Sequence, residues 1–187
     1  MNRRSFAAGA ALLALAGCAV QGTPPLGPDG LPLPQVYRIG PGDGAQINFR
    51  MLDSVNSLRA ASGAPPLELN SRLAAAAATH SRDMAVQNRP WHFGSDGSSP
   101  LDRVQRVGYR GQFLGETISE TFESELETLA AWMEEPETRG VILDPRARDM
   151  GFAWHQEMNG KIWWTLVLGT PETASGPADG AAPAPGL

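Results

Sequence analysis

The segment from Ile162 to Leu168 constrains the fold more than any other part of the sequence. Its apolar side chains occupy both sides of a period-two pattern. One side carries Ile162, Trp164, Leu166 and Leu168, and the other carries Trp163, Thr165 and Val167. A strand with two apolar faces needs a cover on each face. The sequence therefore predicts a sheet with helices packed on both sides.

A second alternating segment precedes this strand. Met150, Phe152 and Trp154 alternate with Gly151, Ala153 and His155. The pair Asn159-Gly160, between the two segments, is typical of a type I′ turn. We therefore expect an antiparallel hairpin at the end of the domain.

Helical spacing of apolar residues predicts four helices ahead of the hairpin. They are expected at about 45–62, from a cap at Asn70 or Ser71 to Pro90, from the N-cap Ser99 to Gly108, and at about 121–134. The fourth helix is expected to present an apolar stripe that starts at Phe122. These helices and the hairpin define one domain, residues 45–170.

The first 18 residues, 1–18, predict a secretory leader. A basic end with Arg3 and Arg4 precedes an apolar run that is too short to span a bilayer. The run that ends at Cys18 looks like a bacterial lipobox, in which the cysteine is acylated and becomes the new N-terminus. The arginine pair also resembles a twin-arginine signal, so the general and the twin-arginine export routes both stay open. Cys18 is thus the predicted membrane anchor, and Ala19 favours the periplasmic face of the outer membrane in a Gram-negative cell.

Segments rich in proline and glycine flank the domain. Residues 19–44 predict a tether, and residues 171–187 predict a disordered tail. Cys18 is the single cysteine, so the domain is expected to fold without a disulfide bond. The formal net charge of −5 argues against a nucleic-acid partner, because binding to phosphates needs a basic face.

The segment from Trp91 to Ile118 carries the main candidates for chemistry. His92 precedes a Gly/Ser turn, and Glu116 follows a glycine. A histidine and a glutamate brought together in this way can form a metal site, an acid/base pair or a structural hydrogen bond. His80 lies on the apolar face of the second helix and is expected in the core. Ser99 is explained as a helix cap, and no Ser-His-Asp order supports a triad.

In the order and spacing of its motifs, the chain resembles the bacterial form of the CAP or SCP superfamily of cysteine-rich secretory, antigen 5 and pathogenesis-related proteins. The resemblance covers about residues 48–169. It rests on Asn56 and Arg59 before Gly63, the helix with His80 and Asp83, His92 with SDGSSP and Arg103, GETI at 115–118, WMEEPETR at 132–139 and VILDP at 141–145. The family implies a three-layer α-β-α sandwich of the α/β class, with a small, mostly antiparallel sheet covered by helices on both faces.

Members of this family often carry two histidines and two glutamates in a central cleft, sometimes with zinc. By this resemblance His92 matches the first histidine, Glu116 the glutamate of the GEN motif, and Glu135 the second glutamate of many eukaryotic members. Thr138 stands where bacterial members usually have a histidine, and Thr117 replaces the asparagine of GEN. The three candidates would give zinc or another divalent cation one nitrogen and two oxygen ligands, a weak set. We therefore expect no tightly bound cofactor, and a hydrogen bond from His92 and Glu116 to each other or to nearby backbone.

These inferences predict an exported, lipid-anchored binding module of the cell envelope. Its expected ligand is a lipid, a glycan or a protein. The alternative is a metal-dependent hydrolase or protease in which His92 and Glu116 are the catalytic candidates. In that case Glu116 or a metal-bound water would act as the base.

Overall fold

The computed structural model describes residues 36–172. The predicted leader with Cys18, residues 19–35 of the tether and residues 173–187 of the tail lie outside the described residues. The helices are α1 (Gly44–Ala61), α2 (Ser71–Gln87), α3 (Pro100–Arg106), α4 (Glu125–Glu134) and α5 (Pro136–Ile142). The strands are β1 (Glu68–Leu69), β2 (Gln112–Thr121), β3 (Asp149–Gln156) and β4 (Ile162–Thr170). None of the helices in residues 36–172 has the length and apolar character needed to cross a bilayer.

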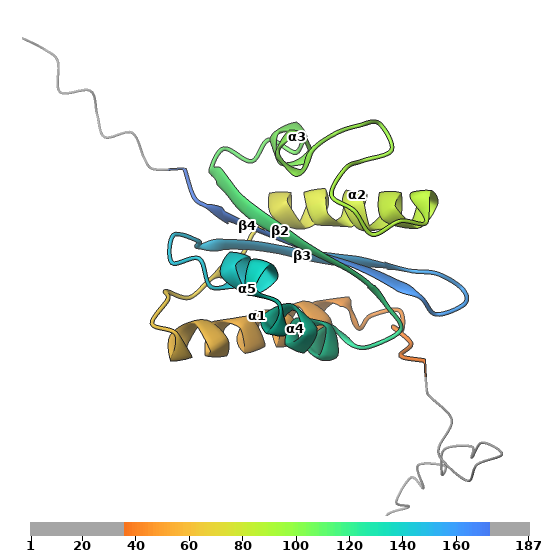
Figure 1. The fold of residues 1–187 in the computed structure, drawn as a ribbon, viewed down its shortest axis with the longest axis horizontal. Helices are drawn as coiled ribbons and strands as arrows, with labels where there is room; N and C mark the ends of the chain where they lie inside the picture. Colours follow the sequence, from red (N-terminus) through yellow and green to blue (C-terminus); the bar gives the residue numbers. More distant parts are fainter. Residues whose placement is uncertain (1–35, 173–187) are drawn as a thin grey trace, which may run out of the picture. The chain divides into compact units, whose positions relative to one another are not determined.

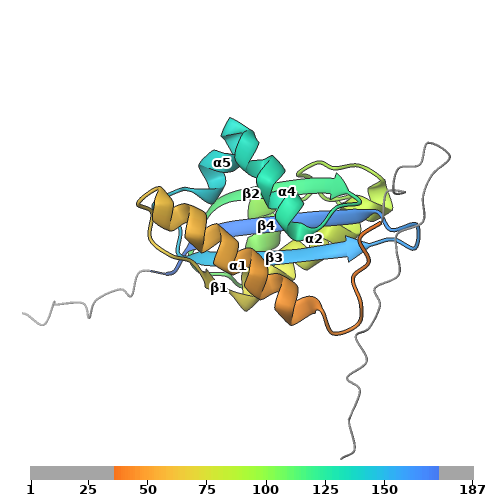
Figure 2. The same cartoon turned by 90° about the horizontal axis from the view of Figure 1, so that it is seen from below.

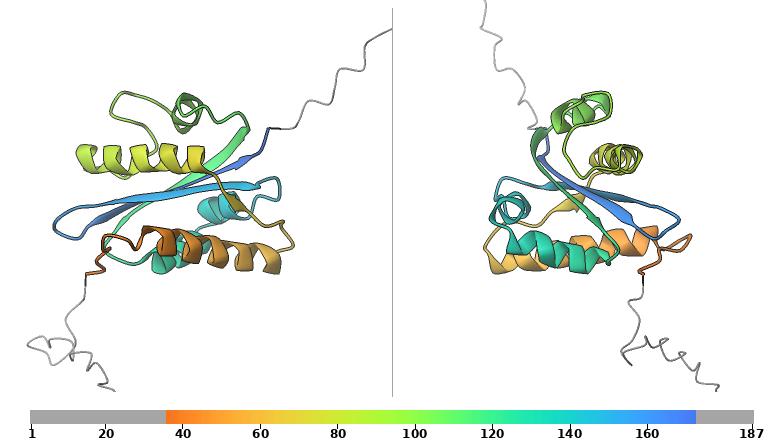
Figure 3. Two further views of the ribbon diagram at one scale, coloured as in Figure 1. Left: turned by 180° about the vertical axis from the view of Figure 1, so that it is seen from behind. Right: turned by 45° about the vertical axis from the view of Figure 1, so that its right-hand side comes forward.

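The strands form one sheet in the order β1-β3-β4-β2. The pairs β2–β4 and β3–β4 are antiparallel, and the short pair β1–β3 is parallel. Helices α2 and α3 cover one face of the sheet, and α1, α4 and α5 cover the other (Figure 1, Figure 3). This arrangement confirms the predicted three-layer α-β-α sandwich with a mostly antiparallel sheet.

Strand β4 lies at the centre of the core. Every residue from Ile162 to Gly169 is buried, and Trp163 and Trp164 are 0% exposed. Trp164 belongs to the larger apolar cluster, under α1 and α4, whereas Val167 belongs to the smaller cluster under α2. Both faces of the strand are therefore covered, as its sequence predicts. Figure 2 shows α1 and α4 crossing this sheet.

The turn between β3 and β4 differs from the expected type I′. That turn needs a positive φ at both central residues, and Asn159 does not have one, whereas Gly160 has φ 98°. The backbone N–H of Gly160 donates to the carbonyl of Glu157, and Glu157 N–H donates to the carbonyl of Lys161. Only the glycine takes the left-handed conformation, as in a hairpin that ends in a bulge.

The region between residues 112 and 142 differs most from the sequence prediction. Residues 121–124 do not start a helix, since β2 runs to Thr121 and α4 begins at Glu125. Ser124 caps α4 and forms a capping box with Glu127. Phe122 lies outside the helix and is 47% exposed, so it contributes nothing to an apolar stripe. Strand β2 and helix α5 were not expected.

Residues 36–43, the last part of the expected tether, pack on the domain. Tyr37 and Ile39 contact the larger apolar cluster. Tyr37 N–H donates to the carbonyl of Phe122, and Ile39 N–H donates to the side chain of Gln156. The folded unit therefore begins before the expected boundary at residue 45.

Candidate functional site

Glu116 is the centre of a buried polar cluster on the face of the sheet that α2 and α3 cover. Its position follows from β2, in which Gly115 faces α5 and the side chain of Glu116 lies on the opposite face of the sheet. A Cβ atom on Gly115 would lie 2.8 Å from a methyl group of Val141 in α5. The alternation of a strand then directs the next side chain to the opposite face. The Glu116 side chain is 2% exposed.

Arg103 neutralises the buried carboxylate of Glu116. Its Nη2 lies 3.0 Å from Oε1 and 2.9 Å from Oε2 of Glu116. Its Nη1 donates to the backbone carbonyls of His92 and Ser98, at 3.0 and 3.1 Å. Helix α3 begins with a capping box between Ser99 and Asp102, which places Arg103 one residue further along. The guanidinium therefore joins the loop before α3 to strand β2.

His92 lies at the solvent-facing side of the cluster. Its Nδ1 is 2.9 Å from Oε1 of Glu116, and its side chain is 50% exposed. Because a carboxylate accepts, Nδ1 is the nitrogen that donates. In the neutral imidazole Nε2 is then the accepting nitrogen. The structure thus brings together two of the three predicted site residues, His92 and Glu116, through a direct hydrogen bond.

His80 closes the cluster from α2. It is 0% exposed, as expected for a core residue, and its Nε2 lies 2.9 Å from the carbonyl oxygen of Trp91 and 3.6 Å from Oε1 of Glu116. Its Nδ1 has no hydrogen-bond partner among residues 36–172. Burial lowers the pKa of His80, and the nearby charge of Glu116 only partly opposes this effect. The ring is therefore held neutral, with its proton on Nε2.

The three candidate ligands, His92, Glu116 and Glu135, do not form a group that could hold a metal ion. Glu135 is exposed and lies at the junction of α4 and α5, where its backbone carbonyl accepts from Arg139 N–H. Within residues 36–172 no group of three or more His, Cys, Asp or Glu side chains is placed to hold a metal ion. Both oxygens of Glu116 already accept hydrogen bonds from Arg103. These donors do not fit zinc, which is held by at least three protein ligands.

Thr138 has a structural role at the position where bacterial relatives usually carry a histidine. Its hydroxyl donates to the carbonyl of Trp132, near the end of α4. That carbonyl has no further turn of helix to bond it. The hydroxyl thus stabilises the junction between α4 and α5.

Two features of the cluster were not predicted from the sequence: the pairing of Arg103 with Glu116 and the proximity of His80 to Glu116. Arg103 has a sequence signal, since it stands next to Val104 inside a capped helix that must pack on the sheet. A charged residue on such a face needs a buried partner of opposite charge. The sequence did not show which carboxylate this partner would be, because strand β2 was not expected. His80 offers no equivalent signal, because a buried histidine is most often a plain core residue.

The geometry described above is that of an α-β-α sandwich with a small polar cluster at one side of its sheet. Residues 52–168 match the family model described as CAP: Cysteine-rich secretory protein family. The match covers more than half of the chain. The chain therefore belongs to the CAP family.

A curated relative and several solved structures extend this result. The chain is 27% identical over 120 residues to the uncharacterized protein YkwD of Bacillus subtilis. The aligned region covers 64% of this chain and 46% of that protein. The chain thus spans about half of the length of that relative. An extracellular protein containing a SCP domain from Bacillus anthracis has a TM-score of 0.60 at 21% identity, with 72% of this chain and 47% of that chain covered.

A second solved structure shares the fold over its whole length. This outer surface protein from Borrelia burgdorferi has a TM-score of 0.60 at 14% identity, with 74% of this chain and 100% of that chain covered. At these identities the solved structures support the fold alone.

Proposed function

We propose that this chain is an exported CAP domain that binds a ligand of the bacterial cell envelope and does not catalyse a reaction. The observation that carries the proposal is the state of Glu116. A general base or a metal ligand needs a free oxygen lone pair directed at its target. Both oxygens of Glu116 face Arg103, and Oε1 also accepts from His92. Three of the roughly four lone-pair sites of the carboxylate therefore accept hydrogen bonds within the fold, and the side chain is only 2% exposed.

Export and lipid anchoring form the second part of the proposal. The leader with Cys18 supports both, and the descriptions of two similar structures, an extracellular protein and an outer surface protein, fit export. Acylation would hold the protein at a membrane, since each buried methylene contributes about 0.8 kcal/mol and more than one chain anchors stably. The proposed place is the periplasmic face of the outer membrane.

Metal analysis of the purified protein and three variants tests the proposed function against its rival, a metal-dependent enzyme. We expect no stoichiometric metal in the wild type, in His92→Ala or in Glu116→Gln. The control is His155→Ala, which removes a histidine outside the cluster. Stoichiometric metal that is lost in His92→Ala and Glu116→Gln but kept in His155→Ala would support the rival function, a metal-dependent hydrolase or protease.

The test of anchoring is labelling with radioactive palmitate in the producing cells. We expect label in the wild type and none in Cys18→Ser. We also expect the variant to move from the membrane fraction to the soluble fraction. An unlabelled wild type that fractionates like Cys18→Ser would refute the anchor and leave the domain's binding role untouched.

A further inference from the structure

Three exposed apolar side chains lie at one end of the domain. Met158, in the turn between β3 and β4, is 97% exposed, Phe122, just after β2, is 47% exposed, and Val36, the first described residue, is 39% exposed. Figure 1 and Figure 3 show the start of the arm 36–43, this turn and the end of β2 at the same end of the sheet. We refer to Val36, Phe122 and Met158 together as the end face.

Hydrogen bonds hold the three segments of the end face together. Tyr37 N–H donates to the carbonyl of Phe122 at 3.2 Å, and Nη1 of Arg38 donates to the carbonyl of Met158 at 2.9 Å. A Cβ atom on Gly160 in the turn would clash with a methyl group of the valine that starts the arm, so this valine packs closely on the turn. The exposed apolar side chains therefore project from a backbone that is fixed by its own contacts.

The charges around the end face nearly cancel. Its three segments, residues 36–40, 120–123 and 157–161, carry two cations and three carboxylates: Arg38, Lys161, Glu120, Glu123 and Glu157. Lys161 and Glu120 form an ion pair at 2.7 Å. A surface with so small a net charge has no strong attraction for anionic headgroups. It fits a zwitterionic headgroup layer, where apolar contact provides the attraction.

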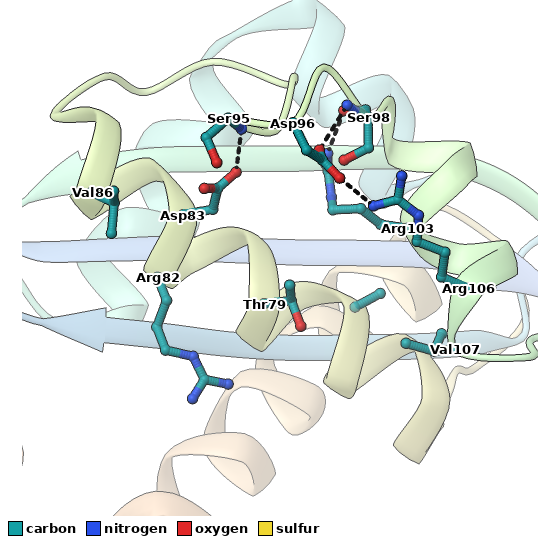
Figure 4. Close-up of a pocket in the computed structure, with 11 residues that line it drawn as sticks. Thr79, Arg82, Asp83, Val86, Ser95, Asp96, Ser98, Arg103, Arg106 and Val107 are labelled. Atoms are coloured by element: carbon teal, nitrogen blue, oxygen red, sulfur yellow. Dashed lines mark hydrogen bonds and ion pairs between the residues drawn. The ribbon is translucent and has the colours of Figure 1, made fainter.

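The groove of about 550 Å³ between α2 and the segment before α3 offers no comparable surface (Figure 4). Val86 borders this groove and is 81% exposed. The lining also holds Asp83, which accepts from the backbone N–H of Ser95, and Asp96, which accepts from Arg106. These charged groups line a concave surface, so contact with lipid would cost their hydration and bring little apolar contact.

The proposed anchor keeps the end face close to a membrane. Cys18 precedes Val36 by 18 residues, a length that spans at most about 60 Å when fully extended. The chain also enters the domain through the end face, because Val36 belongs to it. An anchored domain meets the lipid at an effective concentration set by this short span, so docking needs far less affinity than binding from solution. The anchor thus makes a small apolar surface sufficient.

We propose that the end face docks on the zwitterionic lipid surface of the membrane that carries the anchor. The side chains of Val36, Phe122 and Met158 enter the interface between headgroups and acyl chains. Docking fixes the orientation of the domain, with the start of β2, roughly 30 Å from its end, directed away from the lipid. This inference rests on the proposed lipid anchor and adds to it a second contact, made by the folded domain.

The experiment uses the full-length lipidated protein in phosphatidylcholine vesicles, with a fluorophore on one introduced cysteine. Cys18 is the only cysteine of the chain and is consumed by acylation, so the introduced thiol is the only one that reacts. Asn159→Cys labels the end face beside Met158, and Gln112→Cys labels the exposed start of β2. We expect a lipid with a nitroxide on its acyl chain to quench the first label at least about 5-fold more strongly than the second.

Matched variants, followed with the label at Asn159→Cys, test whether apolar contact drives the docking. Phe122→Ser and Phe49→Ser each remove an exposed phenylalanine, but Phe49 lies on α1, outside the end face. We expect Phe122→Ser to lower the ratio of docked to free domain by about 3- to 10-fold, because one partly buried aromatic contact is lost, and Phe49→Ser to leave it unchanged. Met158→Asp should abolish docking, since it places a charge in the lipid interface, and Met158→Leu should preserve it.

Equal quenching of the two labels, or an equal effect of Phe122→Ser and Phe49→Ser, would overturn the proposal. Docking that strengthens on phosphatidylglycerol vesicles and disappears at high salt would also overturn it, because the attraction would then be electrostatic. Excimer emission from pyrene labels at Asn159→Cys would make the end face an interface between copies of the chain, against the proposal. A wild type that incorporates palmitate but shows no quenching at the end face would overturn this inference alone. A wild type without palmitate would overturn the proposed anchor, and this inference with it.

Discussion

At the scale of single residues, the cluster around Glu116 depends on one buried ion pair. Glu116 and Arg103 have side chains that are 2% and 4% exposed. Such a pair contributes little net stability, because both charges lose their hydration, but removal of one partner leaves the other charge buried and unpaired. The pair also fixes His92, which contacts both Glu116 and Arg103. The cluster therefore specifies one geometry of the loop before α3.

The first prediction follows from the cost of an orphaned charge. Arg103→Met leaves Glu116 buried without a cation, and we expect the free energy of unfolding to fall by about 3–5 kcal/mol. The double variant Arg103→Met with Glu116→Leu removes both charges, and we expect it to be more stable than Arg103→Met alone. Urea unfolding followed by tryptophan fluorescence measures both. A double variant less stable than Arg103→Met would contradict this account of the pair.

The second prediction concerns His80 and pH. Burial lowers the pKa of His80 in the native state below its ordinary value of 6.5. The unfolded chain therefore binds a proton at a pH where native His80 stays neutral, so stability is complete above about pH 6.5 and falls as the pH decreases toward the lower native pKa. We expect His80→Asn to lose this part of the pH dependence, because asparagine does not titrate.

Urea unfolding at pH 7.5 and pH 5.5 provides the measurement. The stability difference between wild type and His80→Asn should be smaller at pH 5.5. Carboxylates with a lowered pKa, such as Asp102 and Asp144, titrate below this pH range and do not contribute to the difference. The same difference at both pH values would mean that native His80 binds its proton as the unfolded chain does.

At the scale of elements, helix caps and strand patterns were readable from the sequence, and long-range contacts were not. Asn70 accepts from the N–H groups of Arg72 and Leu73, and Ser99 forms its capping box, so both helix starts agree with the prediction. These signals lie within four residues of the feature that they define. A prediction from sequence is most secure where the cause is this local.

Strand β2 and helix α5 show why the rest was missed. The sequence of β2 carries Gly115 and a charged residue, Glu116, where a strand pattern calls for apolar side chains. Gly115 is explained by the close approach of Val141, and Glu116 by Arg103. Both partners come from other elements, so no local pattern reveals them. Helix α5 starts at Pro136, a residue that also ends helices, and its seven residues give too short a period to detect.

The candidate site also contains residues that the sequence placed correctly and residues that it did not. The motif match brought His92 and Glu116 together correctly, because both belong to one sequence segment. Glu135 was carried over from the family pattern, and the structure leaves it exposed at a helix junction. Arg59 gives a further example at this scale. It is fully buried, and its guanidinium donates to the backbone carbonyls of Pro65, Ile142, Asp144 and Ala147. These carbonyls lie in the loop after α1, at the end of α5 and in the loop after α5, so only the folded chain defines this role.

At the scale of the whole molecule, the two tyrosines of the chain hold the two ends of the domain. The Tyr37 hydroxyl donates to Oε2 of Glu125 at 3.0 Å, and Arg50 holds the other oxygen of that buried carboxylate. The Tyr109 hydroxyl lies 2.6 Å from Oδ2 of Asp149 and 2.7 Å from the carbonyl oxygen of Thr170. Burial and the neighbouring carboxylates raise the pKa of both phenols, so each remains a neutral donor at physiological pH. Tyr37 thus secures the arm 36–43, and Tyr109 secures the end of β4.

This arrangement predicts two local and reciprocal effects, because each hydroxyl acts at one end of the domain. Tyr37→Phe loses the hydrogen bond to Glu125, worth about 1 kcal/mol, and the longer one from Arg50. We therefore expect hydrogen exchange at the amides of Tyr37 and Ile39 to be faster by about 5-fold or more. Exchange at the amide of Arg148, which donates to the carbonyl of Gly169, should stay unchanged in that variant. Tyr109→Phe should show the reverse pattern, with faster exchange at Arg148 and no change in the arm. Faster exchange at both ends in either variant would contradict this prediction, because it would mean that the two ends of the domain open together.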